Sequence, residues 1–518
     1  MSSFSLHEML RADGGAAAAD VSDAAPVVRP AASPRTLSPL AESIARLPVR
    51  NSASPSVLAG LVRLLDFALI VGTGLVIYAF YVEEDGLLSS YLTATILTAI
   101  VSVVVFEAAH SYHAAALRSV IGQSMRILGC WTLVFLLMSA ALFFLKAGSS
   151  YSRVWLAAWY GLGFASLLLQ RVGVAQIVKA LTRAGRLERR AAIVGGGEPA
   201  EKLIRAIEAQ GERDVKICGV FDDRGDDRSP DVVAAYPKLG TVDELVEFAR
   251  RTRLDLVVFA LPVSAENRIL AMLRKLWVLP VDIRLSAHMQ KLRFRPRSYS
   301  YVGGVPVFDM MDKPIADWDI VLKWSFDKFV GTAMLVLLSP VLLGVAVAVK
   351  LDSRGPVFFK QRRYGFNNEL IEVFKFRSMY VEQSDATAAR LVTKGDARVT
   401  RVGRFIRKAS LDELPQLFNV VFRGNLSLVG PRPHAVHAKA QDRLYDEVVD
   451  GYFARHKVKP GITGWAQVNG WRGETDTSDK IQKRVEHDLY YIENWSIFFD
   501  AYILAMTPVS LTRTENAY

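Results

Sequence analysis

Cysteine is nearly absent from this chain of 518 residues, which contains only Cys130 and Cys218. Cys130 lies in an apolar run and Cys218 in a soluble stretch, so the sequence has neither a disulfide framework nor a Cys-x-x-Cys metal site. Zinc-finger spacings and an aromatic RNA-binding signature are also missing. Their absence argues against nucleic acid as the partner of this basic chain, whose net charge is +11. We expect the soluble parts to be cytoplasmic.

An early apolar segment of the kind that marks a signal peptide is missing from the first 55 residues. This stretch is instead rich in Ala, Ser and Pro, and it cannot bury enough apolar surface to order itself. We therefore expect residues 1–55 to be a disordered cytoplasmic tail.

Apolar residues, by contrast, are plentiful, at 51% of the chain. Four runs long enough to span a membrane, at 57–82, 87–108, 120–145 and 152–171, predict a transmembrane bundle over residues 56–175. Buried helices of a soluble protein are the alternative, but four such runs in succession are hard to hide in one core. Basic residues before the first run, in the second connection and after the fourth run place both ends of the bundle in the cytoplasm.

Short apolar runs alternate with helical stretches between residues 188 and 311, which predicts a Rossmann-like parallel α/β domain. The expected strands are RRAAIVGGG, VKICGVFDD, LDLVVFALP and PVDIRLS, and the expected helices are 198–210, 241–252 and 264–277.

A glycine-rich turn follows the first of these strands. It includes Gly195 and Gly197 and opens a helix, while Asp222 ends the next strand, as in dinucleotide-binding folds. The glycines would let a pyrophosphate approach the helix start, and the acid could accept a hydrogen bond from a ribose hydroxyl. The alternative is that the fold keeps the turn for packing and binds nothing, or only regulates.

A fifth apolar run covers residues 329–349 and is about 30 Å long as a straight helix, enough to cross a bilayer. Both of its flanks are basic, and Pro340 near its middle removes a helical hydrogen bond. The Ser339 hydroxyl could bond to a carbonyl that this break frees. These features favour a re-entrant helical hairpin over residues 320–350 that enters and leaves on the cytoplasmic face. A kinked but spanning helix is the alternative.

Basic residues recur in the loop-like segments of residues 351–518, and one of these segments, RKASLDELPQL, also contains an acid pair, Asp412 and Glu413. Arg-, Gly- and Pro-rich loops are typical of phosphate recognition. The ordinary interpretation of the pair is a helix start, because Ser410 and Glu413 have the spacing of a capping box. The chemical interpretation is that a carboxylate attacks phosphorus, provided that a metal and basic residues neutralise the substrate.

Four motifs in this region resemble the bacterial sugar transferase domain of the monotopic phosphoglycosyl transferases. They are KFRSM at 375–379, LDELPQLFNV at 411–420, SLVGPRP at 427–433 and KPGITGWAQVNG at 459–470. With the preceding spans and the Rossmann-like domain, the chain resembles the longer polyprenyl-phosphate hexose-1-phosphate transferases. WRGETDT at 471–477 and the last three residues are most similar to the undecaprenyl-phosphate glucose phosphotransferases.

This resemblance implies a mostly helical cytoplasmic catalytic domain over residues 351–518, in a protein of the bacterial inner membrane. It also implies a two-step reaction in which Asp412 attacks the β-phosphate of UDP-glucose, releases UMP and holds a phosphosugar. Undecaprenyl phosphate then takes the phosphosugar, as in the first membrane step of exopolysaccharide or capsule synthesis. UDP-galactose or another hexose donor is the alternative substrate, and a homodimer is a further expectation.

The resemblance also implies roles for the surrounding residues. Glu413 would hold Mg²⁺, and the phosphate contacts would come from Lys375, Arg377, Arg407 and Arg432. For each basic residue the alternative is a solvated or structural charge.

Two other classes of function compete with this hypothesis. A membrane-tethered nucleotide-sugar dehydratase or epimerase would need a Tyr-x-x-x-Lys pair, and no tyrosine of the sequence has a lysine at that spacing. A nucleotide-binding scaffold that regulates export would keep full sugar transfer in cells after Asp412→Asn.

Overall fold

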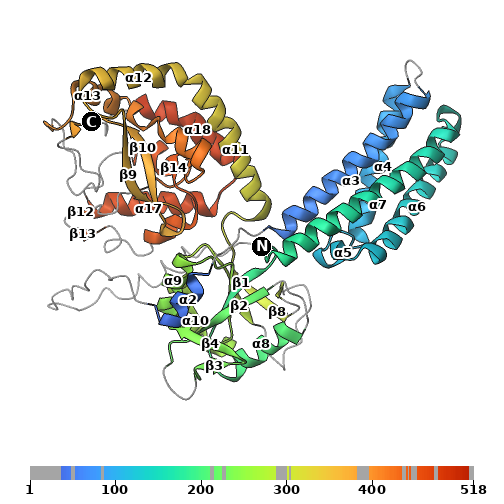
Figure 1. Ribbon diagram of the computed structural model, residues 1–518, viewed down its shortest axis with the longest axis horizontal. Helices are drawn as coiled ribbons and strands as arrows, with labels where there is room; N and C mark the ends of the chain where they lie inside the picture. The colour runs from blue at the N-terminus through green and yellow to red at the C-terminus, as the bar shows by residue number, and fades with distance from the viewer. Residues whose placement is uncertain are drawn as a thin grey trace, which may run out of the picture. The chain divides into compact units, whose positions relative to one another are not determined.

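The computed structural model describes residues 37–47, 53–82, 87–209, 215–224, 229–286, 300–302, 305–381, 396–433, 439–440, 443–444, 452–471 and 477–512. Within these ranges the chain forms a bundle of long helices, an α/β domain and a third domain that contains the acid pair (Figure 1).

A short helix, α2 (Pro39–Ala45), lies inside the stretch that was expected to be disordered. The Ser38 side chain caps it by accepting a hydrogen bond from the Ala41 amide at 3.2 Å. Leu37, Ala41 and Ala45 are buried in the core of the α/β domain. The prediction for residues 1–55 was therefore wrong for this segment, because a few apolar residues at helical spacing can be buried against another element.

Four long helices form the predicted bundle, and each is long and apolar enough to span a membrane. They are α3 (Pro55–Ile77), which continues as the π-helical turn η2 (Tyr78–Val82), α4 (Leu88–Ala108), α6 (Val120–Phe144) and α7 (Arg153–Arg183). The short helix α5 (Ala114–Arg118) and the 3-10 turn η3 (Gly148–Ser150) lie in the connections. Two tryptophans hold α7 to α3, since Trp155 and Trp159 donate indole hydrogen bonds to backbone carbonyls of α3 at 2.8 and 3.0 Å.

The bundle also contains a buried ion pair. Arg171 of α7 contacts Asp66 of α3 at 2.6 Å, and neither side chain is exposed to solvent. The Tyr112 hydroxyl donates to the same carboxylate oxygen of Asp66 at 2.7 Å. Charges buried at membrane depth need such partners, because the hydrocarbon cannot solvate them.

The α/β domain is built on a mixed sheet of eight strands in the order β3-β4-β2-β1-β5-β6-β8-β7. The strands are β1 (Arg189–Val194), β2 (Val215–Phe221), β3 (Val232–Val233), β4 (Tyr236–Gly240), β5 (Leu256–Phe259), β6 (Asp282–Ser286), β7 (Ser300–Val302) and β8 (Val305–Met311). The four expected strands are parallel neighbours, as predicted. The whole sheet is mixed, because the additional strands β3, β7 and β8 pair antiparallel.

Helices cover both faces of this sheet. The expected three are α8 (Glu198–Ala209), α9 (Val242–Arg251) and α10 (Glu266–Leu276). Along β1, Ala191 and Ile193 pack in the cluster that contains α8, whereas Ala192 and Val194 pack in the cluster that contains α9 and α10. A central strand buried on both faces is hydrophobic throughout, which explains the continuous apolar run in the sequence.

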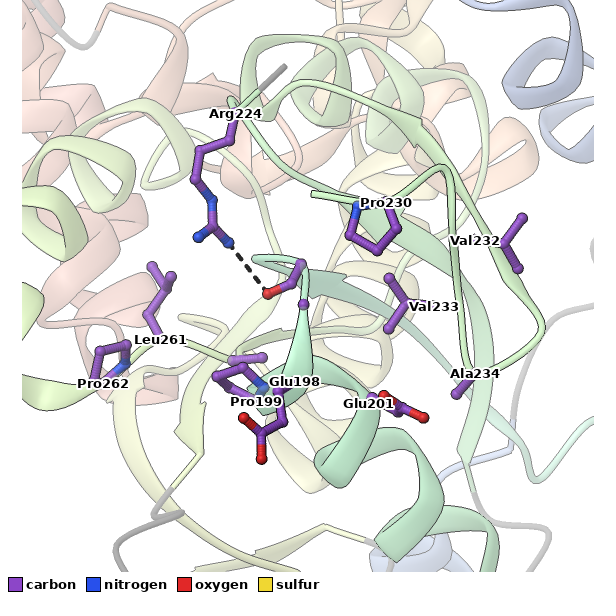
Figure 2. Close-up of a pocket in the computed structure, with 13 residues that line it drawn as sticks. Glu198, Pro199, Glu201, Arg224, Pro230, Val232, Val233, Ala234, Leu261 and Pro262 are labelled. Atoms are coloured by element: carbon purple, nitrogen blue, oxygen red, sulfur yellow. Dashed lines mark hydrogen bonds between the residues drawn. The ribbon is translucent and has the colours of Figure 1, made fainter. Parts of the chain in front are cut away.

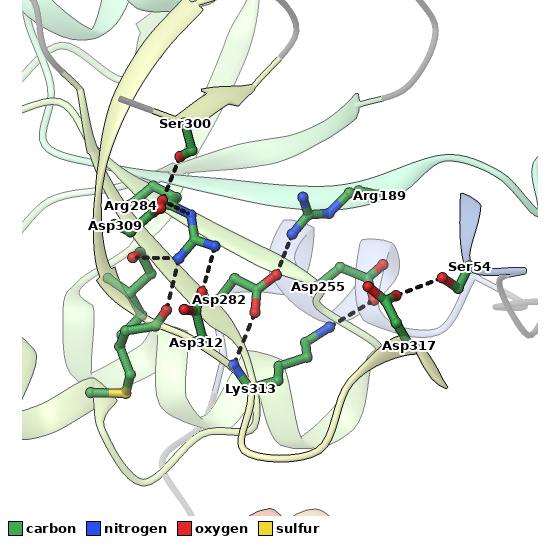
Figure 3. Close-up of polar contacts among 12 residues, drawn as sticks. Ser54, Arg189, Asp255, Asp282, Arg284, Ser300, Asp309, Asp312, Lys313 and Asp317 are labelled. Carbon is green, nitrogen blue, oxygen red and sulfur yellow. Dashed lines mark hydrogen bonds and ion pairs between the residues drawn. The ribbon is translucent and has the colours of Figure 1, made fainter. Parts of the chain in front are cut away.

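A polar network lies at the amino-terminal ends of the parallel strands (Figure 3). Asp282 at the start of β6 forms an ion pair with Arg189 of β1 and accepts a hydrogen bond from the Lys313 amide at 3.0 Å. The Lys313 ammonium reaches Asp255, just ahead of β5, at 3.3 Å. These contacts fix the segment that leaves β8 toward the next helix.

The fifth apolar run forms two helices, α11 (Asp317–Leu337) and α12 (Ser339–Asp352), which are bent by 60° at the break between them. Pro340 lies in the first turn of α12, where its missing N–H costs no helical hydrogen bond. The Ser339 hydroxyl donates to the Val336 carbonyl at 2.7 Å, as the sequence indicated.

The third domain combines helices with three small sheets. The antiparallel pair β9 (Phe358–Tyr364) and β10 (Leu370–Phe376) flanks the 3-10 turn η6 (Phe366–Asn368), β11 (Ser427–Val429) pairs parallel with β14 (Gly461–Thr463), and β12 (Lys439–Ala440) pairs with β13 (Arg443–Leu444). The helices and helical turns are α13 (Arg401–Lys408), η8 (Leu411–Glu413), α14 (Gln416–Phe418), η9 (Asn419–Arg423), η10 (Tyr452–Lys457), α16 (Trp465–Val468), α17 (Ser478–Glu493) and α18 (Ile497–Thr512). Helices α11, α17 and α18 share one hydrophobic core with β11.

Candidate active site around the acid pair

Asp412 and Glu413 lie on the single 3-10 turn η8, between the end of α13 and the start of α14. The expected capping box does not form: Ser410 is left-handed, with φ of 55°, and its side chain makes no capping hydrogen bond. A left-handed residue ends α13, and Pro415 then precedes α14. The acid pair therefore lies on a tight turn that connects two helices, and the prediction of a regular helix start was wrong.

Two cations hold the Glu413 carboxylate. Lys375 of β10 and Arg432, in the loop after β11, both contact Glu413 Oε1, at 2.9 and 2.5 Å. Burial raises the pKa of Glu413, but Arg432 and Lys375 outweigh burial and bring that pKa below its usual range. Glu413 is therefore ionised throughout the physiological range.

Asp412 has the opposite electrostatic character. Burial and the neighbouring Glu413 carboxylate raise the pKa of Asp412, Lys375, Arg407 and Arg432 partly offset this rise, and the resulting pKa is about 6. At neutral pH the group is mostly a carboxylate, yet it is less well solvated than a carboxylate in water. Such a carboxylate can serve as a nucleophile.

Arg407, at the end of α13, acts on the site through its charge, since it lowers the pKa of Asp412. Arg377 is not brought to the acid pair. It is 4% exposed and donates hydrogen bonds to the Val349 carbonyl, in the last turn of α12, and to the Ser353 and Arg354 carbonyls just after the helix. The last carbonyls of a helix lack internal partners, so Arg377 has a structural task here.

Arg363 of β9 belongs to the site although sequence reasoning did not select it. It lines a depression together with Glu413, Gln416, Arg432, Gly461 and Ile462. Burial and the nearby Arg432 lower the pKa of Arg363 to about 10, so it stays charged at neutral pH. Together with Lys375, Arg407 and Arg432, it gives four cations around two carboxylates, an excess of two positive charges.

Asp488 of α17 is 1% exposed. It forms an ion pair with Arg455 of η10 at 2.5 Å. The helical spacing of nearby polar residues gave no signal of this burial, because Asp488 is paired with a residue more than 30 positions away.

The two carboxylates fit a metal ion whose other ligands come from the substrate. In the described parts of the chain, no three His, Cys, Asp or Glu side chains are grouped as a metal site. Magnesium is commonly bound by one or two carboxylates plus phosphate oxygens and water, so a complete protein cage is not required. Glu413, which stays ionised, is the suitable protein ligand.

A second cavity, of about 520 Å³, lies in the α/β domain at the carboxyl ends of β1 and β5 (Figure 2). The predicted turn forms part of its wall, and Gly195 and Gly197 have positive φ of 101° and 78°. Asp222, however, accepts a hydrogen bond from the Gly196 amide at 2.8 Å and forms an ion pair with Arg224 at 2.7 Å. The Asp222 carboxylate therefore bonds to the glycine-rich turn itself.

Charge in this second cavity also differs from that of a pyrophosphate site. Glu198 and Glu201, on the first turn of α8, line the cavity where a helix start would otherwise attract an anion (Figure 2). Binding of a nucleotide here stays a prediction.

Two known families match this chain, each over a different part of it. The bacterial sugar transferase family matches residues 318–514, which contain the acid pair and its cations. A CoA-binding domain family matches residues 107–287, which include part of the bundle and most of the α/β domain.

Several curated relatives are similar over most of the chain. A UDP-glucose:undecaprenyl-phosphate glucose-1-phosphate transferase of Xanthomonas campestris pv. campestris is 33% identical over 88% of this chain and 94% of its own length. The protein of the same name from Escherichia coli K12 is 36% identical over 84% and 92%. An undecaprenyl-phosphate glucose phosphotransferase of Komagataeibacter xylinus is 41% identical over 70% of this chain, and the match spans 66% of that relative.

Phosphoglycosyl transferases generally use a divalent metal, which agrees with the carboxylate pair. The motifs, the site that they form and the extent of the matches lead to one conclusion. The chain belongs to the bacterial sugar transferase family and is a phosphoglycosyl transferase with four helices long and apolar enough to span a membrane.

Proposed function

We propose that this protein transfers glucose 1-phosphate from UDP-glucose to undecaprenyl phosphate, giving undecaprenyl-diphospho-glucose and UMP. The observation that carries the proposal is the pairing of two unlike carboxylates. Glu413 is held ionised by Lys375 and Arg432, while burial raises the pKa of its neighbour Asp412 to about 6. The choice of glucose is supported by the names of the full-length relatives. UDP-galactose or another hexose donor is the alternative.

The first step assigns Asp412 as the nucleophile. Its carboxylate oxygen attacks the phosphorus that bears the sugar, the bond from that phosphorus to the bridging oxygen breaks, and UMP leaves with the electron pair. In the second step an oxygen of undecaprenyl phosphate attacks the same phosphorus. The bond to Asp412 breaks, and the carboxylate is regenerated.

The surrounding charges suit this substrate. The diphosphate of UDP-glucose carries two negative charges, which the excess of two positive charges around the acid pair balances. Lys375, Arg407 and Arg432 orient the phosphates, and Arg363 adds a fourth charge. Glu413 would hold Mg²⁺, which would supply further neutralisation of the phosphate oxygens.

The same proposal includes the location of the reaction. The third domain lies on the cytoplasmic side of the bacterial inner membrane, the α11–α12 pair enters and leaves on that side, and the product begins an exopolysaccharide or capsule. The 60° break between α11 and α12 and the basic residues on both flanks support this topology. Self-association into a dimer stays a prediction.

The nature of the released nucleotide tests the reaction. Membranes that contain the full chain, given UDP-glucose, Mg²⁺ and undecaprenyl phosphate, should release UMP; release of UDP would contradict an attack on phosphorus. Asp412→Asn should abolish this release. Glu372→Gln, a control at a half-exposed acid paired with Arg423, should keep it.

Donor specificity is tested by repeating the assay with UDP-galactose and other UDP-hexoses, where the largest kcat/KM identifies the sugar. Full activity of Asp412→Asn would instead favour the rival interpretation, in which the protein is a nucleotide-binding scaffold.

A further inference from the structure

The loop that presents Arg432 to Glu413 is held by backbone pairing only in its first half. It covers residues 430–433, and Pro431 and Pro433 on either side of Arg432 have no backbone N–H. Prolines therefore remove two of the donors with which the loop could pair with a neighbouring strand. The first half of the loop is still paired with β14, since the Gly430 amide donates to the Thr463 carbonyl at 2.9 Å and the Pro431 carbonyl accepts from the Gly461 amide at 3.0 Å. At Arg432 and Pro433, the rest of the domain holds the loop through carbonyl oxygens.

Side chains from several elements donate to these carbonyls. Arg455 of η10 donates to the Arg432 carbonyl at 2.7 Å, and Arg363 of β9 donates to the Pro433 carbonyl. At the start of the loop, the Val429 carbonyl accepts from Lys323 of α11 at 2.8 Å and from the Tyr491 hydroxyl of α17 at 3.1 Å. The backbone is thus fixed before Arg432 by β14 and at Arg432 and Pro433 by the two arginines.

Each arginine is itself held in place. Arg455 is fully buried, and its Nη2 contacts Asp488 Oδ2 at 2.5 Å as well as the Arg432 carbonyl. Arg363 donates through Nε and Nη2 to Gln361 Oε1, at 3.0 and 2.7 Å, while Nη1 reaches the loop. Each guanidinium therefore bonds both to a second side chain, Asp488 or Gln361, and to a carbonyl of the loop.

Stability alone does not account for the buried Arg455–Asp488 pair. Desolvation of two charges roughly cancels their attraction, and apolar residues of similar size often serve as well in such a place. An apolar pair could not, however, donate a hydrogen bond to the Arg432 carbonyl. The need for a fixed donor at this point explains the charges.

We propose that Arg455, anchored by Asp488, and Arg363 are positioning residues that set the Arg432 loop so that its guanidinium meets Glu413 and the substrate phosphate. The proposal rests on the function proposed above, in which Arg432 contacts phosphate. Arg455 acts only through the loop, because it is fully buried.

The decisive variant replaces the ion pair by apolar residues, Arg455→Met with Asp488→Leu. In the full chain it should melt within about 3 °C of the parent, because exchange of a buried pair for apolar groups is often neutral. Its kcat/KM for UMP release should fall about 100-fold, the effect of a displacement of about 1 Å in a reacting geometry. An exposed pair outside the loop, Arg423→Met with Glu372→Leu, is the matched control and should keep the parent rate.

Combining these variants with a substitution of Arg432 distinguishes a positioning role from a general loss of folded structure. The loss caused by Arg455→Met with Asp488→Leu should largely disappear when it is measured in an Arg432→Lys background, since a misplaced loop matters only if it carries the guanidinium. Arg455→Lys, which keeps the charge beside Asp488, provides the same comparison if the double variant folds poorly. Arg363→Lys should behave likewise.

Two results would overturn the proposal in different ways. If Arg432→Lys lowers UMP release and the Arg455 variants add their full loss to it, positioning is wrong and the function stands. If Arg432→Lys has the parent rate, the phosphate role of Arg432 is wrong, and the positioning proposal is wrong with it.

Discussion

The pKa of one carboxyl group sets the pH dependence that we expect from the enzyme. Burial raises the pKa of Asp412 to about 6, and only its carboxylate can attack. The rate of the first step should therefore be level above pH 7 and fall about tenfold per unit below pH 6. The measurement is a single-turnover burst of UMP without lipid acceptor, because undecaprenyl phosphate itself titrates in this range.

A substitution of Arg407, on helix α13, tests whether Asp412 causes that pH dependence. Arg407 lowers the pKa of Asp412, so Arg407→Met should raise that pKa and move the acidic limb to higher pH. Arg401→Met, at an exposed position of α13, should leave the limb in place. A profile that stays flat from pH 5 to 8 would contradict the assignment of Asp412 as the nucleophile.

Single residues of the site were predictable to different degrees. Asp412, Glu413, Lys375 and Arg432 were found from short motifs, and the structure brings them together. Arg377 was misjudged because a basic residue in such a motif can equally cap a helix end. Arg363 and Arg455 were missed because their roles depend on partners far along the chain.

At the scale of elements, long apolar runs and alternating strands were the easiest to predict. The four spans and the central strands lie where hydrophobic periodicity placed them. Strands β3, β4, β7 and β8 and helix α2 were missed. Of these, β3, β7 and α2 are short, so they carry little periodic signal and are stabilised by packing. The turn at Ser410 was mistaken for a capped helix, since a capping box and a left-handed turn can share one sequence pattern.

The buried pair between α3 and α7 leads to a prediction about the bundle. Asp66→Asn should destabilise it by about 3–5 kcal/mol, because Arg171 would remain buried without its counter-charge. Asp66→Leu combined with Arg171→Met should recover most of this loss. Thermal unfolding of the full chain in detergent is the measurement.

The bundle offers its own control for this experiment. Arg63 and Glu107 form a half-exposed ion pair at 2.6 Å, and Glu107→Gln should change stability by at most about 1 kcal/mol. Equal melting of the parent and Asp66→Asn would show that the buried pair does not stabilise the bundle.

For the whole molecule, the position of the third domain relative to the membrane can be tested directly. In a chain with Cys130 and Cys218 replaced by Ser, a cysteine at Arg354, just after α12, should resist an impermeant maleimide applied to spheroplasts. A cysteine at Gly148, between α6 and α7, is the control and should react. Reaction at both positions would mean that the α11–α12 pair crosses the membrane.

The break at Ser339 has a consequence for the lipids around the enzyme. A straight helix from Asp317 to Asp352 would have 36 residues. It would be about 54 Å long, more than a bilayer core requires, and would be subject to mismatch with the bilayer thickness. Bent by 60° and returning to the same face, α11 and α12 would rest in one leaflet. Catalysis would then respond to the packing and headgroup charge of the inner leaflet and be nearly indifferent to bilayer thickness. In vesicles, lengthening the acyl chains should change the rate less than changing the anionic lipid content.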